Sequence, residues 1–96
     1  MQFARDLRQR VIDGEITRSV RIWQRPRVKV GNGYRLGDGE VVVDAIREIT
    51  LEEVTPTLAR ETGFAGVVDL LKTAKHGTGE RVFLVDFHYR ADGSLV

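Results

Sequence analysis

The stretch RVFLVDFHYR, residues 81–90, constrains the fold more than any other part of this chain. Four consecutive apolar side chains, Val82 to Val85, leave it without a polar face. An extended segment of this kind is typical of strands that are buried on both faces. The sequence therefore predicts a central strand of a sheet, and the rest of the chain has to supply its neighbours.

Three helices are predicted from spacing and capping signals. Residues 2–13 carry apolar side chains at helical intervals, and Gly14 follows as a natural helix end. The Thr-Pro pair at 55–56 predicts an N-cap and first position of a short helix that continues to Glu61. Residues 64–77 have the same apolar spacing and predict a helix closed by Gly77.

Strands are predicted between these helices. Residues 19–23 alternate apolar and polar side chains, and residues 27–30 continue the alternation after Pro26, which favours a bend or an edge position. The stretch GNGYRLGDGE, residues 31–40, is rich in turn residues, and its Asp-Gly pair is a hairpin signal. We interpret it as two turns, because it lacks the lysine and following helix of a phosphate-binding loop. The β-branched residues 40–49 then predict a long strand.

The expected fold is α+β: about five mostly antiparallel strands, closed into a small barrel and flanked by short helices. Closure into a barrel removes exposed sheet edges. The 96 residues are expected to form a single domain, residues 1–96.

Composition excludes several classes of protein. There is no cysteine, so disulfides, thiolate zinc sites and thiol nucleophiles are excluded. Two histidines offer too few ligands for a metal site, and no cofactor motif is present, so we expect neither metal nor cofactor. The charged N-terminus is unlike a signal peptide, and no apolar run is long enough to span a membrane. We expect a cytoplasmic protein without a membrane partner.

Charge is distributed unevenly along the chain. Residues 1–36 hold nine basic and three acidic side chains, a net charge of +6, whereas residues 37–96 hold six and eleven, a net charge of −5. Such polarity favours a basic face that attracts phosphates, and RNA or a nucleotide is the expected partner. Two alternatives stay open: the two segments neutralise each other in the fold, or the basic face meets an acidic protein.

The order of the short motifs resembles the ASCH domain, a member of the PUA-like group of β-barrels associated with RNA. The resemblance covers nearly the whole chain: an opening helix ending in glycine, then GEITRSVR, VKVG, ARETGFAGVVDLL and a last strand ending at Phe87. It implies a PUA-like barrel that binds RNA. Some members act on modified nucleosides such as acetylated cytidine, or cleave RNA.

The family stretch runs glycine, any residue, lysine, two more, threonine, any residue, arginine. Gly14 and Arg21 match it, Ser19 replaces the threonine and Ile16 replaces the lysine. In the amidohydrolase branch the threonine is thought to be the nucleophile and the lysine its activator. A serine needs an adjacent base, and isoleucine cannot accept a proton. We therefore expect no catalysis; the alternative is a hydrolase or ribonuclease in which Ser19 acts with Glu61 or His88.

The period of two along a strand places Ser19, Arg21 and Trp23 on one face. A hydroxyl, a guanidinium and an indole on one face suit a nucleotide, with Arg21 on phosphate and Trp23 stacked on a base. The alternative for Trp23 is packing at the end of the barrel, and for Arg21 an ion pair with Asp86. The expected binding residues are all in the first strand and the segment after it: Arg18, Ser19, Arg21, Trp23, Arg25, Arg27 and Lys29.

Asp86, His88 and Arg90 share one face of the last strand. An acid and a histidine can form a proton relay, since histidine titrates near neutral pH. We prefer a structural interpretation, in which Asp86 and His88 hydrogen-bond each other or the backbone at the rim of the barrel.

Overall fold

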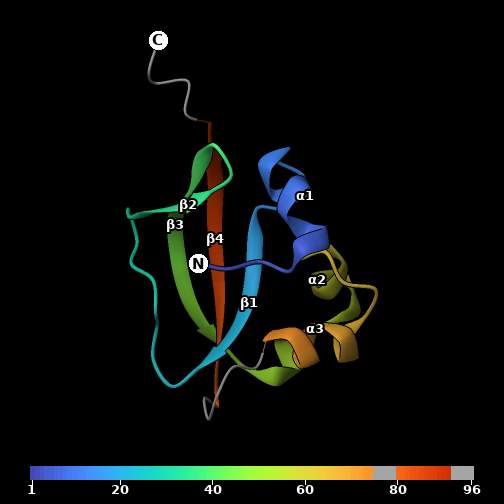
Figure 1. Cartoon of the computed structure of the whole chain (residues 1–96). Helices are drawn as coiled ribbons and strands as arrows, with labels where there is room; N and C mark the ends of the chain where they lie inside the picture. The colour runs from blue at the N-terminus through green and yellow to red at the C-terminus, as the bar shows by residue number, and fades with distance from the viewer. Residues whose placement is uncertain (75–79, 92–96) are drawn as a thin grey trace.

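A computed structural model describes residues 1–74 and 80–91, and Figure 1 shows their arrangement. Its four strands form one antiparallel sheet in the order β1-β4-β3-β2. The bounds are Arg18–Trp23 for β1, Gly33–Leu36 for β2, Gly39–Ile49 for β3 and Arg81–Arg90 for β4. The predicted central position of the last strand is confirmed, because β4 pairs with β1 on one edge and with β3 on the other.

The helices are short. The chain begins extended, passes through a 3-10 turn, η1 (Arg5–Leu7), and continues as α1 (Arg8–Ile12), where one helix over 2–13 was predicted. A second 3-10 turn, η2 (Leu51–Glu53), leads to α2 (Pro56–Glu61) and α3 (Val67–Ala74). None of the described helices has the length and apolar character needed to span a bilayer.

The prediction for the second helix is confirmed in detail. The Oγ1 atom of Thr55 accepts a hydrogen bond from the backbone N–H of Leu58, 3.2 Å away, and Pro56 occupies the first helical position. Gly63 separates α2 from α3 with φ +98°, a left-handed conformation that glycine adopts at little cost. The third predicted helix corresponds to α3, while its expected end at Gly77 lies outside the described residues.

Two strand predictions were wrong. Residues 33–36 were assigned to turns but form β2, joined to β3 by a tight turn that has Gly37 at φ +60°. Residues 27–30 were expected to be extended, but the whole of residues 24–32 is irregular, so four strands rather than five lie in the described part of the chain. This segment instead packs against the core. Val28 is buried, and the N–H of Gly31 donates a hydrogen bond to the carbonyl of Val43 at 2.7 Å.

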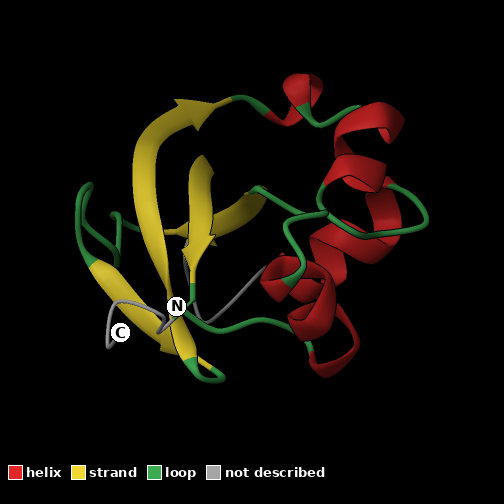
Figure 2. Ribbon diagram, turned by 90° about the horizontal axis from the view of Figure 1, so that it is seen from above, coloured by secondary structure: helices red, strands yellow, loops and turns green. Residues whose placement is uncertain are grey.

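The sheet is strongly curled, and Figure 2 shows the helices gathered on one side of it. A register shift between Val43 and Ala45 interrupts the β3–β4 ladder, as a bulge does where a strand bends. Because successive side chains of a strand point to opposite faces, the two faces of the sheet bury separate apolar clusters. One holds residues from the opening turn and the inside of the curl, including Leu7, Trp23 and Phe87. The other holds α2 and α3 against the opposite face.

Candidate anion site around Arg21

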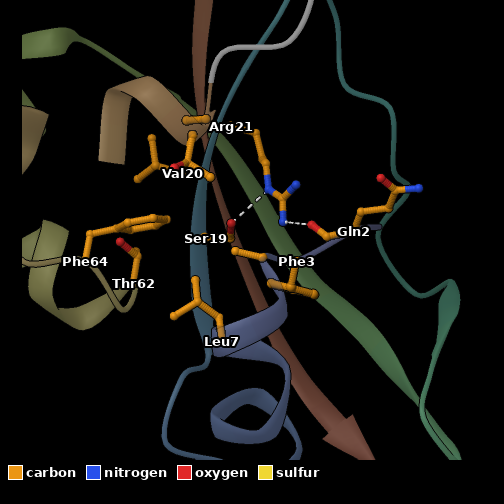
Figure 3. Close-up of a pocket in the computed structure, with 11 residues that line it drawn as sticks. Gln2, Phe3, Leu7, Ser19, Val20, Arg21, Thr62 and Phe64 are labelled. Atoms are coloured by element: carbon orange, nitrogen blue, oxygen red, sulfur yellow. Dashed lines mark hydrogen bonds between the residues drawn. The ribbon is translucent and has the colours of Figure 1, made fainter. Parts of the chain in front are cut away.

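Arg21 lies in the middle of β1 and is buried, with 8 % of its surface exposed. Its Nε atom donates to Oγ of Ser19 at 2.8 Å, and Nη2 donates to the backbone carbonyl of Gln2 (Figure 3). The guanidinium carbon is 5.1 Å from the centroid of the Phe3 ring, within the range of a cation–π contact. The opening segment of the chain and β1 therefore hold the side chain between them.

No carboxylate of the described residues pairs with this cation. Burial lowers the pKa of Arg21 to about 10, which still leaves the group charged at neutral pH. Burial, and to a smaller extent the charge of Arg21, also lowers the pKa of the Met1 ammonium. A buried charge without a counter-ion is costly, so an anion bound at this position would stabilise the fold.

Arg21 also has donors to spare. A guanidinium carries five N–H donors in a planar fork, and the hydrogen bonds to Ser19 and Gln2 use two of them. No hydrogen bond involves Nη1, and every fully buried side-chain nitrogen in the described part of the chain has a partner. Nη1 is therefore accessible to solvent or to a ligand. A phosphate or carboxylate oxygen suits this geometry.

Two hollows meet at Arg21. The first, which we call the apolar pocket, has a volume of about 220 Å³ and is lined by apolar side chains, two aromatic rings and three hydroxyls. Its lining residues are Gln2, Phe3, Ala4, Leu7, Ser19, Val20, Arg21, Thr62, Phe64, Thr73 and Ala74. Figure 3 shows the rings of Phe3 and Phe64 on opposite sides of it. The pocket lies between the opening segment, β1 and the two helices that follow β3.

The second hollow, the basic hollow, has a volume of about 300 Å³ and is lined by Met1, Gln2, Arg21, Trp23, Arg27 and Val28. Three of the predicted binding residues line it: Arg21, Trp23 and Arg27. The guanidinium of Arg21 thus stands between an apolar space and a positively charged one. This combination can accept a ligand that has both a flat apolar part and an anionic group.

Arg18 lies on the opposite face of β1 from Arg21, so the structure does not bring these two predicted binding residues together. The alternation of side chains along a strand requires this, since the two positions differ by an odd number. Arg18 is bound by two acids there: Nη2 is 3.1 Å from Asp86, and Nη1 is 3.5 Å from Glu61. Asp86 was considered as a partner for Arg21, but it pairs with Arg18.

Trp23 is packed rather than open. Only 4 % of its surface is exposed, and its ring centroid lies 6.0 Å from that of Phe83. The alternative interpretation of Trp23 as a packing residue is the one that the structure supports, because a ring so covered has no free face for a base. Arg25, Arg27 and Lys29 are exposed on the segment after β1, and of these Arg27 lines the basic hollow.

Sequence reasoning missed several residues of the site. Gln2, Phe3, Thr62, Phe64 and Thr73 all line the apolar pocket but come from three separate parts of the chain. The sequence contains no local signal for them, since an isolated threonine or phenylalanine is equally common in a core. They come together because the opening segment, the turn after α2 and the end of α3 all pack near β1.

The three residues of the alternative hydrolase are not joined by any hydrogen bond in the described structure. Ser19 contacts Arg21, and Glu61 contacts Arg18. Nδ1 of His88 lies 2.9 Å from a carboxylate oxygen of Asp44, so the expected pairing of His88 with Asp86 was wrong. Ile16, which stands where the ASCH stretch that the sequence resembles has lysine, is part of the core, with 2 % of its surface exposed.

No group of three or more metal-binding side chains lies together within residues 1–74 and 80–91. Comparisons of the chain with protein-family models, with curated proteins and with solved structures gave no significant match.

Proposed function

We propose that this chain is a nucleotide- or RNA-binding domain without catalysis of its own, with Arg21 as its anion-binding group. The observation that carries the proposal is the buried guanidinium of Arg21, which has no carboxylate partner among the described residues and keeps Nη1 accessible. A phosphate group supplies the missing negative charge and accepts the unused donors. An aromatic base on the same ligand would fit the adjoining apolar pocket.

The parts of a nucleotide have separate places in this arrangement. The base enters the apolar pocket between Phe3 and Phe64, where a volume of about 220 Å³ fits a single ring system rather than a drug-sized ligand. The phosphate lies on Arg21 and Arg27 at the basic hollow. Ser19 orients Arg21 rather than contacting a reacting atom.

We also propose that the chain is an ASCH domain of the PUA-like group. Support comes from the order of its motifs and from the curled antiparallel sheet, which is compatible with a small barrel. The replacement of the family lysine by Ile16 removes the activating base. Arginine cannot take over that role, because its guanidinium stays protonated. The proposal is therefore a binding domain and not an amidohydrolase.

The test compares RNA binding by the wild type, Arg21→Met and Arg18→Met at two salt concentrations. The two variants lose the same charge from the same strand, but from opposite faces. We expect Arg21→Met to weaken binding by about 10- to 100-fold, the worth of a charge-assisted hydrogen bond, and Arg18→Met to change it less than about 3-fold. Circular dichroism checks that each variant is folded.

Three results would contradict the proposal. One is the absence of binding to folded wild-type protein at low salt. Another is an equal loss in both variants, which would indicate unspecific attraction to positive charge. The third is displacement of the RNA by an acidic peptide at the same concentration, which would assign the surface to a protein partner. RNA that is cleaved during the titration would restore the hydrolase alternative.

A further inference from the structure

The apolar pocket lies along the free edge of β1 rather than over one of its faces. β1 is an edge strand, with β4 on one side only. Ser19 and Arg21 line the pocket from one face of this strand, and Val20 lines it from the other. Figure 3 shows the strand passing between the helices and the opening segment, with Phe64 on one side of it and Phe3 on the other. The main chain of β1 therefore forms the floor of the pocket.

The pairing of β1 with β4 determines which main-chain groups point into this edge. The N–H of Phe87 donates to the carbonyl of Thr17 at 2.9 Å, and Arg18 is the next residue along, opposite Asp86. Residues of an antiparallel strand bond to their neighbour and point away from it in alternation. The odd-numbered residues of β1 therefore bond to β4, and the N–H and C=O of Val20 point away from β4.

The outward main-chain groups of Val20 are buried and have no protein partner. The residue has 4 % of its surface exposed. Within residues 1–74 and 80–91, no hydrogen bond joins its N–H or C=O to a group outside the sheet. A buried main-chain donor and acceptor need partners, and a ligand in the pocket can supply both.

These two groups favour a compact ring over a peptide. An extended peptide that joins a sheet edge forms hydrogen bonds along several residues of the strand. The next outward groups on this edge belong to Arg18 and Ile22, but neither residue lines the apolar pocket. The pocket thus offers one N–H and one C=O, side by side on Val20. A planar ring that carries an acceptor beside a donor on one edge can bond to both.

We propose that the main chain of Val20 selects the ring that enters the apolar pocket, with its N–H donating to a ring acceptor and its C=O accepting from the adjacent ring N–H or amino group. This inference rests on the proposed function and names the feature of the ligand that the pocket recognises. Each of the four bases has such an edge, the one used in base pairing. The pocket therefore requires a free pairing edge and distinguishes poorly between the four bases.

The test begins with the ligand and uses calorimetric titration of the wild type. The probes are adenosine 5′-monophosphate and two analogues that keep the size of the ring. The 1-deaza analogue lacks the ring acceptor of the pairing edge, and purine riboside 5′-monophosphate lacks the amino donor. We expect each analogue to bind about 10-fold more weakly than the parent, because one main-chain group is left unpaired. The four nucleoside 5′-monophosphates should bind within about 10-fold of one another.

The protein variant is Val20→Pro, which removes the outward N–H. Proline is tolerated on an edge strand where the N–H points away from the neighbouring strand. The matched control is Ile22→Pro, which removes the next outward N–H on the same edge, outside the pocket. In Val20→Pro the parent nucleotide and the 1-deaza analogue should bind equally, because the donor that distinguishes them is gone. In Ile22→Pro the about 10-fold difference should remain. Circular dichroism checks that both variants are folded, and the ligand series in the wild type tests the inference without them.

Equal affinity of the wild type for the parent nucleotide and both analogues would overturn the inference. So would a preference for the parent over the 1-deaza analogue that persists in folded Val20→Pro. A short acidic peptide whose binding is lost in both Val20→Pro and Ile22→Pro would assign the edge to a peptide strand instead.

The proposed function fails in a different way. If Arg21→Met leaves the affinity for the nucleotides unchanged, Arg21 is not the anion-binding group, and both proposals fall. If binding depends on Arg21 but not on the pairing edge of the ring, the function stands and only the role of Val20 is excluded.

Discussion

The buried charge of Arg21 lowers the stability of the unliganded protein, and a bound anion removes this destabilisation. Methionine at this position keeps most of the length of the side chain without its charge. Two hydrogen bonds from a charged donor are lost, each worth about 1.5–3 kcal/mol, and this loss is offset because the desolvation that lowers the pKa of Arg21 to about 10 is relieved. We expect unliganded Arg21→Met to unfold at the same urea concentration as the wild type or at a higher one. Nucleotide should raise the melting temperature of the wild type only. A variant that is clearly less stable would contradict this account.

Ile16 is the second residue with a sharp prediction. Ile16→Lys would introduce the lysine of the ASCH stretch that the sequence resembles, and would place its ammonium group in a core where the native side chain is 2 % exposed. We expect a loss of several kcal/mol in the free energy of unfolding, measured with urea, because a buried charge lacks a partner there. The control Ile16→Val should lose about 0.5–1.5 kcal/mol. A stable Ile16→Lys protein that hydrolyses acetylated cytidine would refute the structural role of Ile16.

For single residues, the sequence predicted which face of a strand a side chain lies on, but not what surrounds that side chain. Alternation correctly placed Ser19, Arg21 and Trp23 on one face. It could not show that the opening segment covers that face, which buries Trp23 and Arg21 together. Nor could it show that Arg18 meets Asp86, since their contact depends on the register of β1 and β4, 68 residues apart in the chain.

Among the elements, the break between α2 and α3 holds the opening helical region in place. A Cβ atom on Gly63 would lie 2.7 Å from Leu7 and 2.8 Å from Ile16, and the backbone there has φ +98°. We expect Gly63→Ala to lower the free energy of unfolding by about 1–3 kcal/mol through strain and overpacking. Gly66→Ala is the control, because a Cβ atom there meets nothing within 4 Å. Equal effects of the two substitutions would show that Gly63 is not a packing constraint.

The pair of Arg81 and Glu48 joins β4 to β3 through two hydrogen bonds of 2.8 and 3.1 Å. The hydrogen bond from Arg81 is the main cause that lowers the pKa of Glu48 from its ordinary value of 4.5. A lowered carboxyl pKa means that the pair stabilises the fold above about pH 4.5 and loses this effect as the pH falls and Glu48 is protonated. Arg81→Gln should therefore reduce the melting temperature more at pH 7 than at pH 3, where only the hydrogen bond from Arg81 to the carbonyl of Gln24 is still lost in full. An equal reduction at both pH values would contradict the assignment.

Elements with local signals were predicted well. Thr55, Pro56 and Gly63 carry their own capping and turn chemistry, and the apolar run of β4 requires two neighbours. The incorrect predictions concern segments whose conformation is determined by tertiary contacts. Residues 27–30 alternate like a strand, but the burial of Val28 and the hydrogen bond from Gly31 to Val43 direct this segment along the core instead.

For the whole molecule, the central feature is which basic side chains pair with acidic ones and which do not. The positive first third of the sequence does not form one uniform basic face, because Arg10 and Arg18 are neutralised by acids. Arg21 and Arg27, which have no described carboxylate partner, line the basic hollow beside the opening residues. Binding by this surface should weaken steeply with salt, since each neutralised phosphate releases counter-ions.

The most direct measurement is the ¹⁵N–¹H spectrum of the arginine Nε–H groups during titration with an RNA hexamer. The Arg21 signal, assigned from its absence in Arg21→Met, should shift as the RNA binds, because a phosphate joins the guanidinium whose Nε donates to Ser19. The Arg81 signal serves as the internal reference, since that group stays bound to Glu48. RNA binding that leaves the Arg21 signal in place while other arginine signals move would contradict the account.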